Sequence, residues 1–127
     1  MESHIRNHEY KSRFINFAGL EWGALRPIDI DLAIEFGNRL FVFGEAKFKD
    51  SPLPYGQRLA LERITDAVEN GERKAICLVA EHNEGDNIVM GACRVREYRW
   101  ERNWYKPHQL AVKDLIDRVL RHLDVCQ

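Results

Sequence analysis

The sequence predicts a mixed α/β fold of the α+β type, with a mixed central sheet that begins with an N-terminal hairpin and is flanked by helices. Three observations predict this fold. A strictly alternating apolar segment, a turn signal and a second apolar segment form the pattern of a hairpin. A helical pattern then leads into a short apolar strand, and such a strand–helix–strand unit implies at least one parallel pairing. An amphipathic pattern near the C-terminus predicts a closing helix, and 127 residues suit a single domain, 1–127.

The first half of the predicted fold is a helix followed by the hairpin. Residues Glu9–Phe17 carry apolar side chains at helical spacing, and two glycines then loosen the chain. Residues Ile28–Phe36 alternate between apolar and polar, which predicts a strand with one buried face. Gly37-Asn38 is a turn signal, and Leu40–Phe48 is predicted to be the second strand of the hairpin.

A loop and a second helix are predicted to follow the hairpin. Lys49–Pro54 is polar and interrupted by proline, which is typical of a loop. Tyr55–Glu69 has the apolar stripe of an amphipathic helix, and Asn70-Gly71 is its stop signal. Ala75–Ala80 is a short and nearly continuous apolar run, so we expect a strand that is buried on both faces.

Two further elements complete the predicted order. After a turn at Asn83–Asn87, Ile88–Tyr98 is predicted to be a strand that becomes basic toward its end. The order is then helix, hairpin, helix, strand, strand, helix, and the sheet is expected to be mixed. The closing helix follows Pro107 and has its apolar positions at Leu110, Leu115, Val119 and Leu123.

Composition limits the location and the partners of the protein. The formal net charge is −1, so nucleic-acid binding would require a local basic surface. The polar N-terminus lacks the apolar run of a signal peptide, and no segment approaches the roughly 18 apolar residues of a transmembrane helix. Cys77, Cys93 and Cys126 form no CxxC pair, so reduced thiols are expected and a zinc site is not. We therefore expect a cytoplasmic protein with no membrane partner.

Charged residues within the two hairpin strands are the strongest indication of chemistry. Asp29 and Asp31 lie two positions apart, as do Glu45 and Lys47, so each pair shares one face of its strand. The face that carries Glu45 is apolar earlier in the strand, which makes a charged pair there unexpected. The simpler alternative is that both pairs are solvated charges on half-exposed strands.

The length of the hairpin turn decides whether the two charged pairs meet. A two-residue turn would pair Ile30 with Glu45 and place the aspartates on the opposite face. A three-residue connection over residues 37–39 would instead set Asp31 beside Glu45. A site built from these residues therefore requires the longer turn or a bulge.

Two carboxylates that converge at a strand pair offer hard oxygen ligands of the kind that Mg²⁺ or Mn²⁺ binds while keeping several waters. A neighbouring lysine could hold or help deprotonate a metal-bound water and could offset negative charge in the transition state. Together these groups form a centre suited to phosphodiester hydrolysis.

The combination of Asp31, a hairpin and Glu45-x-Lys47 in an apolar strand resembles the signature of the PD-(D/E)XK nuclease superfamily. This superfamily includes restriction enzymes, Holliday-junction resolvases and bacterial repair exonucleases. Its core order of elements is similar to the order predicted over roughly residues 10–80. Many members carry a glutamine on the helix after the lysine strand, where this chain has Gln57.

The resemblance implies a restriction endonuclease-like or Holliday-junction-resolvase-like fold and a nuclease that uses a metal ion. It implies Mg²⁺, or Mn²⁺, bound by Asp31 and Glu45, and a water that is activated by the metal and Lys47. Pro27 departs from the family pattern because it does not directly precede Asp31. The four catalytic residues that the resemblance implies are Asp31, Glu45, Lys47 and Gln57.

Three further acidic residues are secondary candidates. Asp29 would lie further than Asp31 from Glu45 along the hairpin. Many relatives have an acidic residue on the first helix, for which Glu9 and Glu21 are alternatives that the sequence leaves open.

A basic and aromatic stretch over residues 94–106 is a candidate surface for nucleic acid, because cations contact phosphates and aromatic rings stack on bases. An equally good interpretation is an amphipathic strand end followed by core aromatics, and Trp100 and Trp104 would also suit a dimer interface. Lys49 has a simpler explanation as a surface charge. The residues predicted to contact nucleic acid are Lys49, Arg58, Arg94, Arg96, Arg99 and Trp100.

The sequence therefore favours a metal-dependent nuclease that hydrolyses phosphodiester bonds of DNA or RNA, with DNA the expected partner. The alternative is a catalytically inactive nucleic-acid-binding or protein-interaction module with the same fold. A homodimer is a further hypothesis, because cutting both strands of a duplex requires two active sites. The sequence leaves open the shape of the substrate and whether cutting starts at an end.

Overall fold

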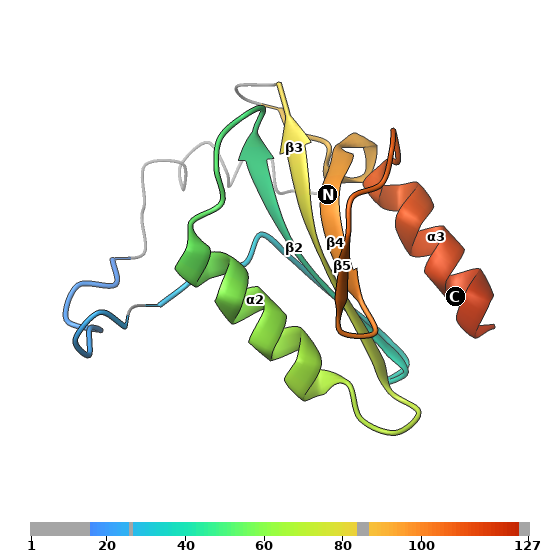
Figure 1. Ribbon diagram of the computed structural model, residues 1–127, viewed down its shortest axis with the longest axis horizontal. Coiled ribbons are helices and arrows are strands. Elements are labelled where there is room, and N and C mark those ends of the chain that lie inside the picture. Colours follow the sequence, from blue (N-terminus) through green and yellow to red (C-terminus); the bar gives the residue numbers. More distant parts are fainter. Residues whose placement is uncertain (1–15, 26, 84–86, 125–127) are drawn as a thin grey trace, which may run out of the picture.

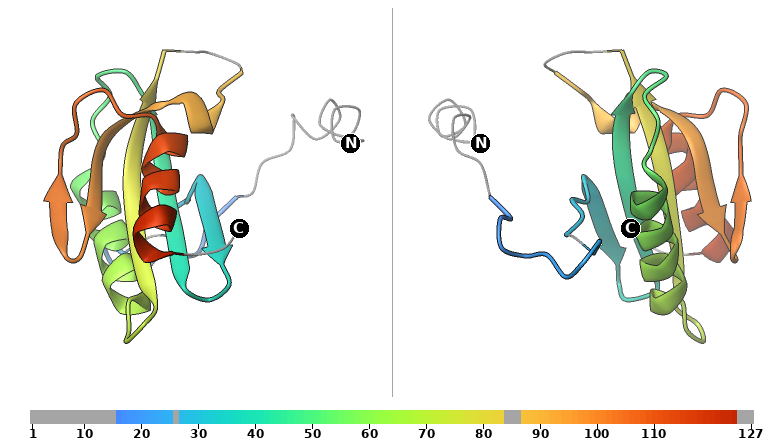
Figure 2. Two further views of the ribbon diagram at one scale, coloured as in Figure 1. Left: turned by 90° about the vertical axis from the view of Figure 1, so that its right-hand side faces the viewer. Right: turned by 60° about the vertical axis from the view of Figure 1, so that its left-hand side comes forward.

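The computed structural model describes residues 16–25, 27–83 and 87–124, which form a five-stranded sheet with a helix on each face (Figures 1 and 2). In spatial order the strands are β1 (Leu32–Phe36), β2 (Leu40–Phe48), β3 (Lys74–His82), β4 (Arg94–Trp100) and β5 (Asn103–Tyr105). The two helices are α2 (Tyr55–Val68) and α3 (Val112–Leu123). This architecture confirms the predicted mixed α/β class.

The pairing of the strands makes the sheet mixed, as the sequence predicts. β2 and β3 are parallel, and α2 provides the connection between them. The other three pairs of neighbouring strands are antiparallel. β3 lies in the middle of the sheet, and its residues 75–80 are all buried, which confirms a strand covered on both faces.

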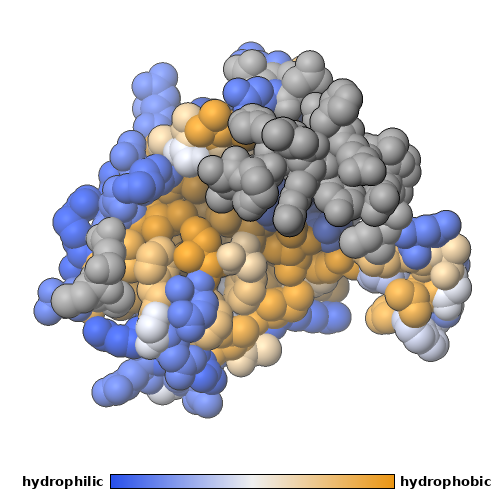
Figure 3. All heavy atoms as spheres, turned by 180° about the vertical axis from the view of Figure 1, so that it is seen from behind, coloured by the Kyte–Doolittle hydropathy of each residue, from blue (hydrophilic) through white to orange (hydrophobic). Residues whose placement is uncertain are grey.

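The main hydrophobic core lies between the sheet and α3. α3 buries one stripe of its surface, and the half-buried side chains of the edge strand β1 pack against the same core. Viewed from behind, hydrophobic side chains gather in the middle of the molecule, and hydrophilic side chains surround much of them (Figure 3). The core residues contributed by α3 are Val112, Leu115, Ile116, Val119 and Leu120.

The face of the sheet that α2 covers is more polar. Leu61 and Thr65 are the buried residues of α2, and Thr65 Oγ1 donates a hydrogen bond to the carbonyl oxygen of Leu61 at 2.7 Å. The sheet beneath this helix contains buried charged side chains, which include Glu45, Glu97 and Arg99. These side chains require partners, and the partners that they have differ along the face.

The first strand is shorter than predicted. The prediction was Ile28–Phe36, whereas β1 begins at Leu32. The amide of Ala46 donates to Asp31 Oδ2 at 2.8 Å, so a side chain accepts the hydrogen bond at the point where the regular ladder ends. β1 therefore begins directly after Asp31, whose side chain bonds to the neighbouring strand.

The predicted strand Ile88–Tyr98 is also wrong at its start. A short 3₁₀ helix, η1 (Met90–Ala92), occupies its first part, and β4 begins only at Arg94. Arg94 pairs with Glu81 near the end of β3, so the residues before it extend past their partner strand. The predicted turn at Asn83–Asn87 lies partly outside the described residues.

β5 was not predicted, and the first helix lies almost entirely outside the described residues. β5 pairs with β4 through a turn in which Glu101 and Arg102 both have positive φ, 49° and 66°. Of the predicted helix Glu9–Phe17, the structure describes only its last two residues, and these are not helical. No helix in the described part of the chain is long and apolar enough to span a membrane.

Candidate active site

The hairpin register brings Asp31 and Glu45 to neighbouring positions. Phe36 pairs with Leu40 and Leu32 pairs with Gly44, so the connection has the three residues that the site requires. Gly37 and Asn38 both adopt positive φ in this turn, which suits glycine and asparagine. The prediction that Asp31 would lie beside Glu45 follows from the three-residue turn and is confirmed.

Asp31 is exposed but is held in place over β2. Its Oδ2 accepts a hydrogen bond from the amide of Ala46 at 2.8 Å, and its own amide donates to the carbonyl oxygen of Gly44 at 3.1 Å. One carboxylate oxygen is thus bound to the backbone of the strand that carries Glu45. These bonds orient the side chain beside Glu45.

Glu45 is the more deeply placed of the two acids, with only 5% of its surface exposed. Its Oε1 accepts a hydrogen bond from Nε2 of Gln57, in the first turn of α2, at 3.3 Å. Its Oε2 is buried and has no hydrogen-bond partner among the described residues. A buried carboxylate oxygen without a partner is costly, and a cation would remove that cost.

The environment raises the pKa of Glu45 from 4.5 to about 7. Burial is the largest cause, followed by the negative charge of Asp31, with a smaller contribution from Asp29, whereas Lys47 opposes the shift. Two close carboxylates in a partly buried site favour either a shared proton or a bound cation. Such a pair is compatible with a divalent cation, because a bound cation would offset the repulsion between the two carboxylates.

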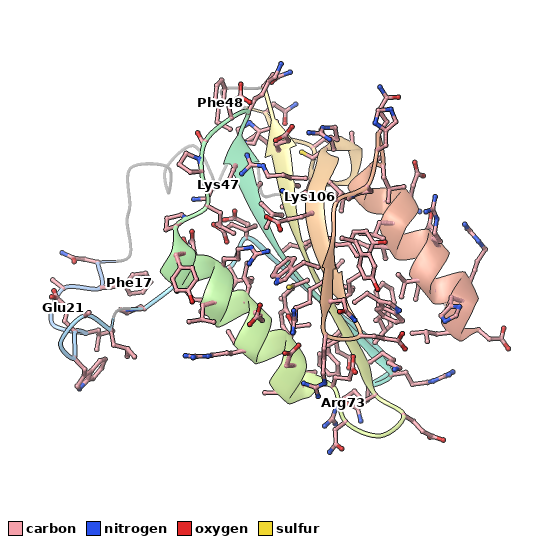
Figure 4. All side chains as sticks on the ribbon, viewed as in Figure 1. Phe17, Glu21, Lys47, Phe48, Arg73 and Lys106 are labelled. Carbon is pink, nitrogen blue, oxygen red and sulfur yellow. The ribbon has the colours of Figure 1, made fainter. Side chains whose placement is uncertain are left out.

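Lys47 and Gln57 complete the group of four predicted residues. Lys47 lies near the end of β2 and is in register with Glu81 of β3 (Figure 4). It shares the α2 side of the sheet with Glu45, and its ammonium group lowers the pKa of that carboxyl. All four predicted residues therefore lie in one region, although they come from two strands and a helix.

The secondary candidates have different positions. Asp29 is exposed and near enough to Glu45 to affect its pKa. Glu21 belongs to the segment before the hairpin and lies well away from Lys47 (Figure 4). Glu9 lies outside the described residues.

The arginines predicted to contact nucleic acid are all paired with carboxylates. Arg58 bonds to Glu97 at 3.0 Å, and Arg99 bonds to Asp66 at 2.8 Å. Both Arg94 and Arg96 bond to a single carboxylate, that of Glu81. Their contact with nucleic acid stays a prediction, but only arginines with remaining hydrogen-bond donors are suited to it.

The other predicted contact residues are an aromatic side chain and a lysine. Trp100 packs against the core on the α3 side and forms an edge contact with His122, with ring centroids 6.2 Å apart. Lys49 is exposed just after β2. Trp104, considered for a dimer interface, donates from Nε1 to Glu62 at 2.8 Å and has the Arg58 guanidinium 4.2 Å from its ring centroid.

A groove beside the site was not expected from the sequence. It has a volume of about 850 Å³ and lies between the segment that precedes the hairpin and α2. Phe17, Leu25 and Ile64 contribute to its apolar walls, and Asp29 and Gln57 also line it. Because these segments are far apart in the sequence, periodicity alone gave no signal for the groove.

The residues present fit a divalent metal with two protein carboxylates. Within residues 16–25, 27–83 and 87–124 no group of three or more His, Cys, Asp or Glu side chains is placed to hold a metal. Two carboxylates with retained waters are nevertheless a common way to bind Mg²⁺. Comparisons with family models, curated proteins and solved structures find no match, so the resemblance to PD-(D/E)XK nucleases rests on these residues alone.

Proposed function

We propose that the protein is a metal-dependent nuclease that hydrolyses phosphodiester bonds of nucleic acid, with DNA the expected substrate. The observation that carries the proposal is the buried Glu45 Oε2, which has no partner among the described residues and lies in a side chain beside Asp31. A structural role explains such an oxygen poorly, because a buried carboxylate that only stabilises a fold is normally paired. A role in binding a cation explains it directly.

Each residue then has a distinct task. Asp31 and Glu45 would hold Mg²⁺ or Mn²⁺, which supplies Lewis acidity and lowers the pKa of bound water. Hydrogen bonds from Ala46 and Gln57 orient the two carboxylates, one each. Lys47 provides a positive charge on the same side of the sheet, suited to the developing charge of the phosphate and to proton transfer.

The raised pKa of Glu45 supports this assignment. A group with a pKa of about 7 is partly protonated at neutral pH, and the proton and a metal ion compete for the same oxygens. Metal affinity is therefore expected to increase as the pH rises from 6 to 8. A salt-bridged structural carboxylate would show the opposite feature, a lowered pKa.

The test is cleavage of supercoiled plasmid, branched DNA, single-stranded DNA and RNA in Mg²⁺ or Mn²⁺, with parallel samples in EDTA. Asp31→Asn and Lys47→Ala are expected to abolish cleavage while the circular dichroism spectrum stays unchanged. Lys113→Ala is the matched control, because Lys113 pairs with Asp117 on α3, across the sheet from the site. Absence of cleavage on every substrate, with nucleic-acid binding retained, would favour an inactive binding module instead.

The homodimer remains a prediction that accompanies cleavage of both strands of a duplex. Sedimentation velocity would measure it directly. A strict monomer at the concentration at which duplex DNA is cut would reject the dimer without affecting the proposed chemistry.

A further inference from the structure

Two buried side-chain atoms have no hydrogen-bond partner in the described part of the chain, and they have opposite charge. One is Glu45 Oε2, which belongs to the candidate metal site, and the other is Nη2 of Arg96. A buried guanidinium nitrogen without an acceptor costs free energy for the same reason as a buried carboxylate oxygen without a donor. Arg96 therefore requires an explanation that the proposed metal site does not give.

The position of Arg96 is set by an irregularity in β4. Val79 of β3 pairs with Glu97, but the next residue, Ala80, pairs with Val95, so Arg96 is the extra residue of a β-bulge. Bulges redirect a side chain relative to the regular alternation of a strand. Arg96 is directed toward β3, where its Nε donates to Glu81 Oε1 at 3.0 Å.

Glu81 connects Arg96 to the candidate site. It is in register with Lys47 in the parallel pair, so the two residues lie on neighbouring strands and on the same face of the sheet. The bond to Glu81 consequently anchors the guanidinium of Arg96 one strand away from Lys47. Glu45 and Lys47 of β2, Glu81 of β3 and the guanidinium of Arg96 from β4 therefore lie on the same face of three adjacent strands.

The charges around Glu81 leave a surplus of positive charge. Its Oε2 accepts both Nε and Nη2 of Arg94, at 3.1 and 2.7 Å, while its Oε1 accepts Arg96. Burial opposes ionisation of Glu81, but the two guanidinium groups outweigh it and lower its pKa. One carboxylate thus faces two arginines, so this group of three side chains has a net positive charge that favours an anion.

We propose that the guanidinium of Arg96, whose side chain is 21% exposed, donates a hydrogen bond to a phosphate oxygen of the nucleic-acid strand that occupies the Asp31–Glu45 site, and that Glu81 positions Arg96 for this contact. The inference rests on the proposed function, because it assigns the binding of the substrate backbone in that same site. A phosphate oxygen is the acceptor that fits a partly buried guanidinium with an unused donor. Because the contact is to the nucleic-acid backbone, its contribution to affinity does not depend on the base sequence.

Binding without cleavage tests this inference separately from the chemistry. Fluorescence anisotropy would measure the affinity for labelled single-stranded and duplex oligonucleotides, in EDTA and in Ca²⁺, over a series of KCl concentrations. Arg96→Met is expected to weaken binding about tenfold. Because one phosphate contact is lost, the slope of log K against log salt should become shallower by about 0.9 for a duplex and about 0.7 for a single strand. Arg118→Met is the matched control, because Arg118 is exposed on α3, on the opposite side of the sheet from Arg96.

A double-mutant cycle tests the role of Glu81. If Glu81 positions Arg96, the effect of Arg96→Met is expected to shrink by at least threefold in a Glu81→Gln background. A merely structural Glu81 would change the melting temperature but leave the effect of Arg96→Met intact. Where Arg96→Met fails to fold, Arg96→Gln is measured instead, because it also removes the charge.

The possible outcomes separate the two proposals. Equal losses in Arg96→Met and Arg118→Met, or no binding of any nucleic acid by the wild-type protein, would overturn the inference. If Arg96→Met binds and cleaves nucleic acid as well as the wild-type protein does, the inference is overturned but the proposed nuclease activity is not. Binding that depends on Arg96 without any cleavage would support the phosphate contact and reject the nuclease.

Discussion

The side of the sheet that faces α2 contains two groups of buried or partly buried charges that differ in one respect. In the paired cluster, formed by Glu62, Asp66, Arg99 and Trp104, every charged group has an opposite partner or a hydrogen-bond donor. In the carboxylate pair, Asp31 and Glu45, two like charges lie side by side and one oxygen is buried without a partner. The first arrangement is explained by stability, whereas the second fits a shared proton or the cation that we propose.

The pKa shifts of the two groups have opposite sign. Hydrogen bonds from Arg99 lower the pKa of Asp66, so folding favours its ionised form. Burial and the charge of Asp31 raise the pKa of Glu45 to about 7, so folding favours its protonated form. Charged residues on an apolar sheet therefore do not identify a functional site unless their partners are known.

The largest expected difference between the two groups is in cleavage. Glu45→Gln removes a carboxylate that the proposed function assigns to metal binding, and it is expected to lower the cleavage rate by about 1,000-fold. The same substitution at Glu62, in the paired cluster, is expected to change the rate by less than about threefold, because Glu62 bonds to Arg99 and Trp104. Single-turnover rates in saturating Mg²⁺ would measure both. A similar loss in both variants would show that the distinction between the groups is wrong.

The second difference is in stability. Arg99→Met leaves Asp66 and Glu62 without their shared cation, so we expect the free energy of unfolding to fall by about 3 kcal/mol. Arg102→Met is the control, because Arg102 is largely exposed at 3.6 Å from Asp66 and should cost less than about 1 kcal/mol. Urea denaturation would compare them. An equal loss of unfolding free energy in the two variants would mean that burial of the Arg99–Asp66 pair adds nothing to stability.

The sequence predicted the carboxylate pair better than the paired cluster, for a physical reason. Alternation in the hairpin strands fixes which residues share a face, and the turn length then fixes which residues meet, so Asp31 and Glu45 could be found locally. In the paired cluster, the bond from Arg99 to Asp66 joins residues 33 positions apart, on a strand and a helix whose arrangement periodicity does not specify.

The elements that the sequence did not predict were missed for similar reasons. The turn before β5 uses Glu101 and Arg102 at positive φ, where glycine or asparagine would have been the expected signal. The late start of β4 depends on where its partner β3 ends, and the bulge at Arg96 depends on pairing across strands. A pattern within one strand contains neither kind of information.

The third difference is the response to pH. The folded-state pKa of Glu45 lies above its unfolded value of 4.5, so its contribution to stability is fully present below about pH 4.5 and is lost as the pH rises through about 7. In EDTA we expect a loss of about 2 kcal/mol between pH 5 and pH 8, which Glu45→Gln should remove. Asp66 has the opposite sign, because its lowered pKa contributes stability that is lost only as the pH falls below 3.8. Urea denaturation from pH 3 to pH 8.5 would measure both, and a wild-type profile equal to that of Glu45→Gln would contradict the raised pKa.

The smallest expected effect tests whether the paired cluster is structural alone. Trp104→Phe keeps an aromatic ring beneath the Arg58 guanidinium, which lies 4.2 Å from the ring centroid, but removes the 2.8 Å hydrogen bond from Nε1 to Glu62. We expect the free energy of unfolding to fall by about 1 kcal/mol, with cleavage and the KCl dependence of binding unchanged. If Trp104 instead stacked on a base, as its position in the basic and aromatic stretch suggested, Trp104→Phe would retain much of the stacking but Trp104→Ala would weaken binding of single-stranded DNA by about tenfold. Measuring both variants therefore distinguishes a ring that supports an internal ion pair from a ring that contacts nucleic acid, and the contacts of Trp104 with Glu62 and Arg58 favour the internal role.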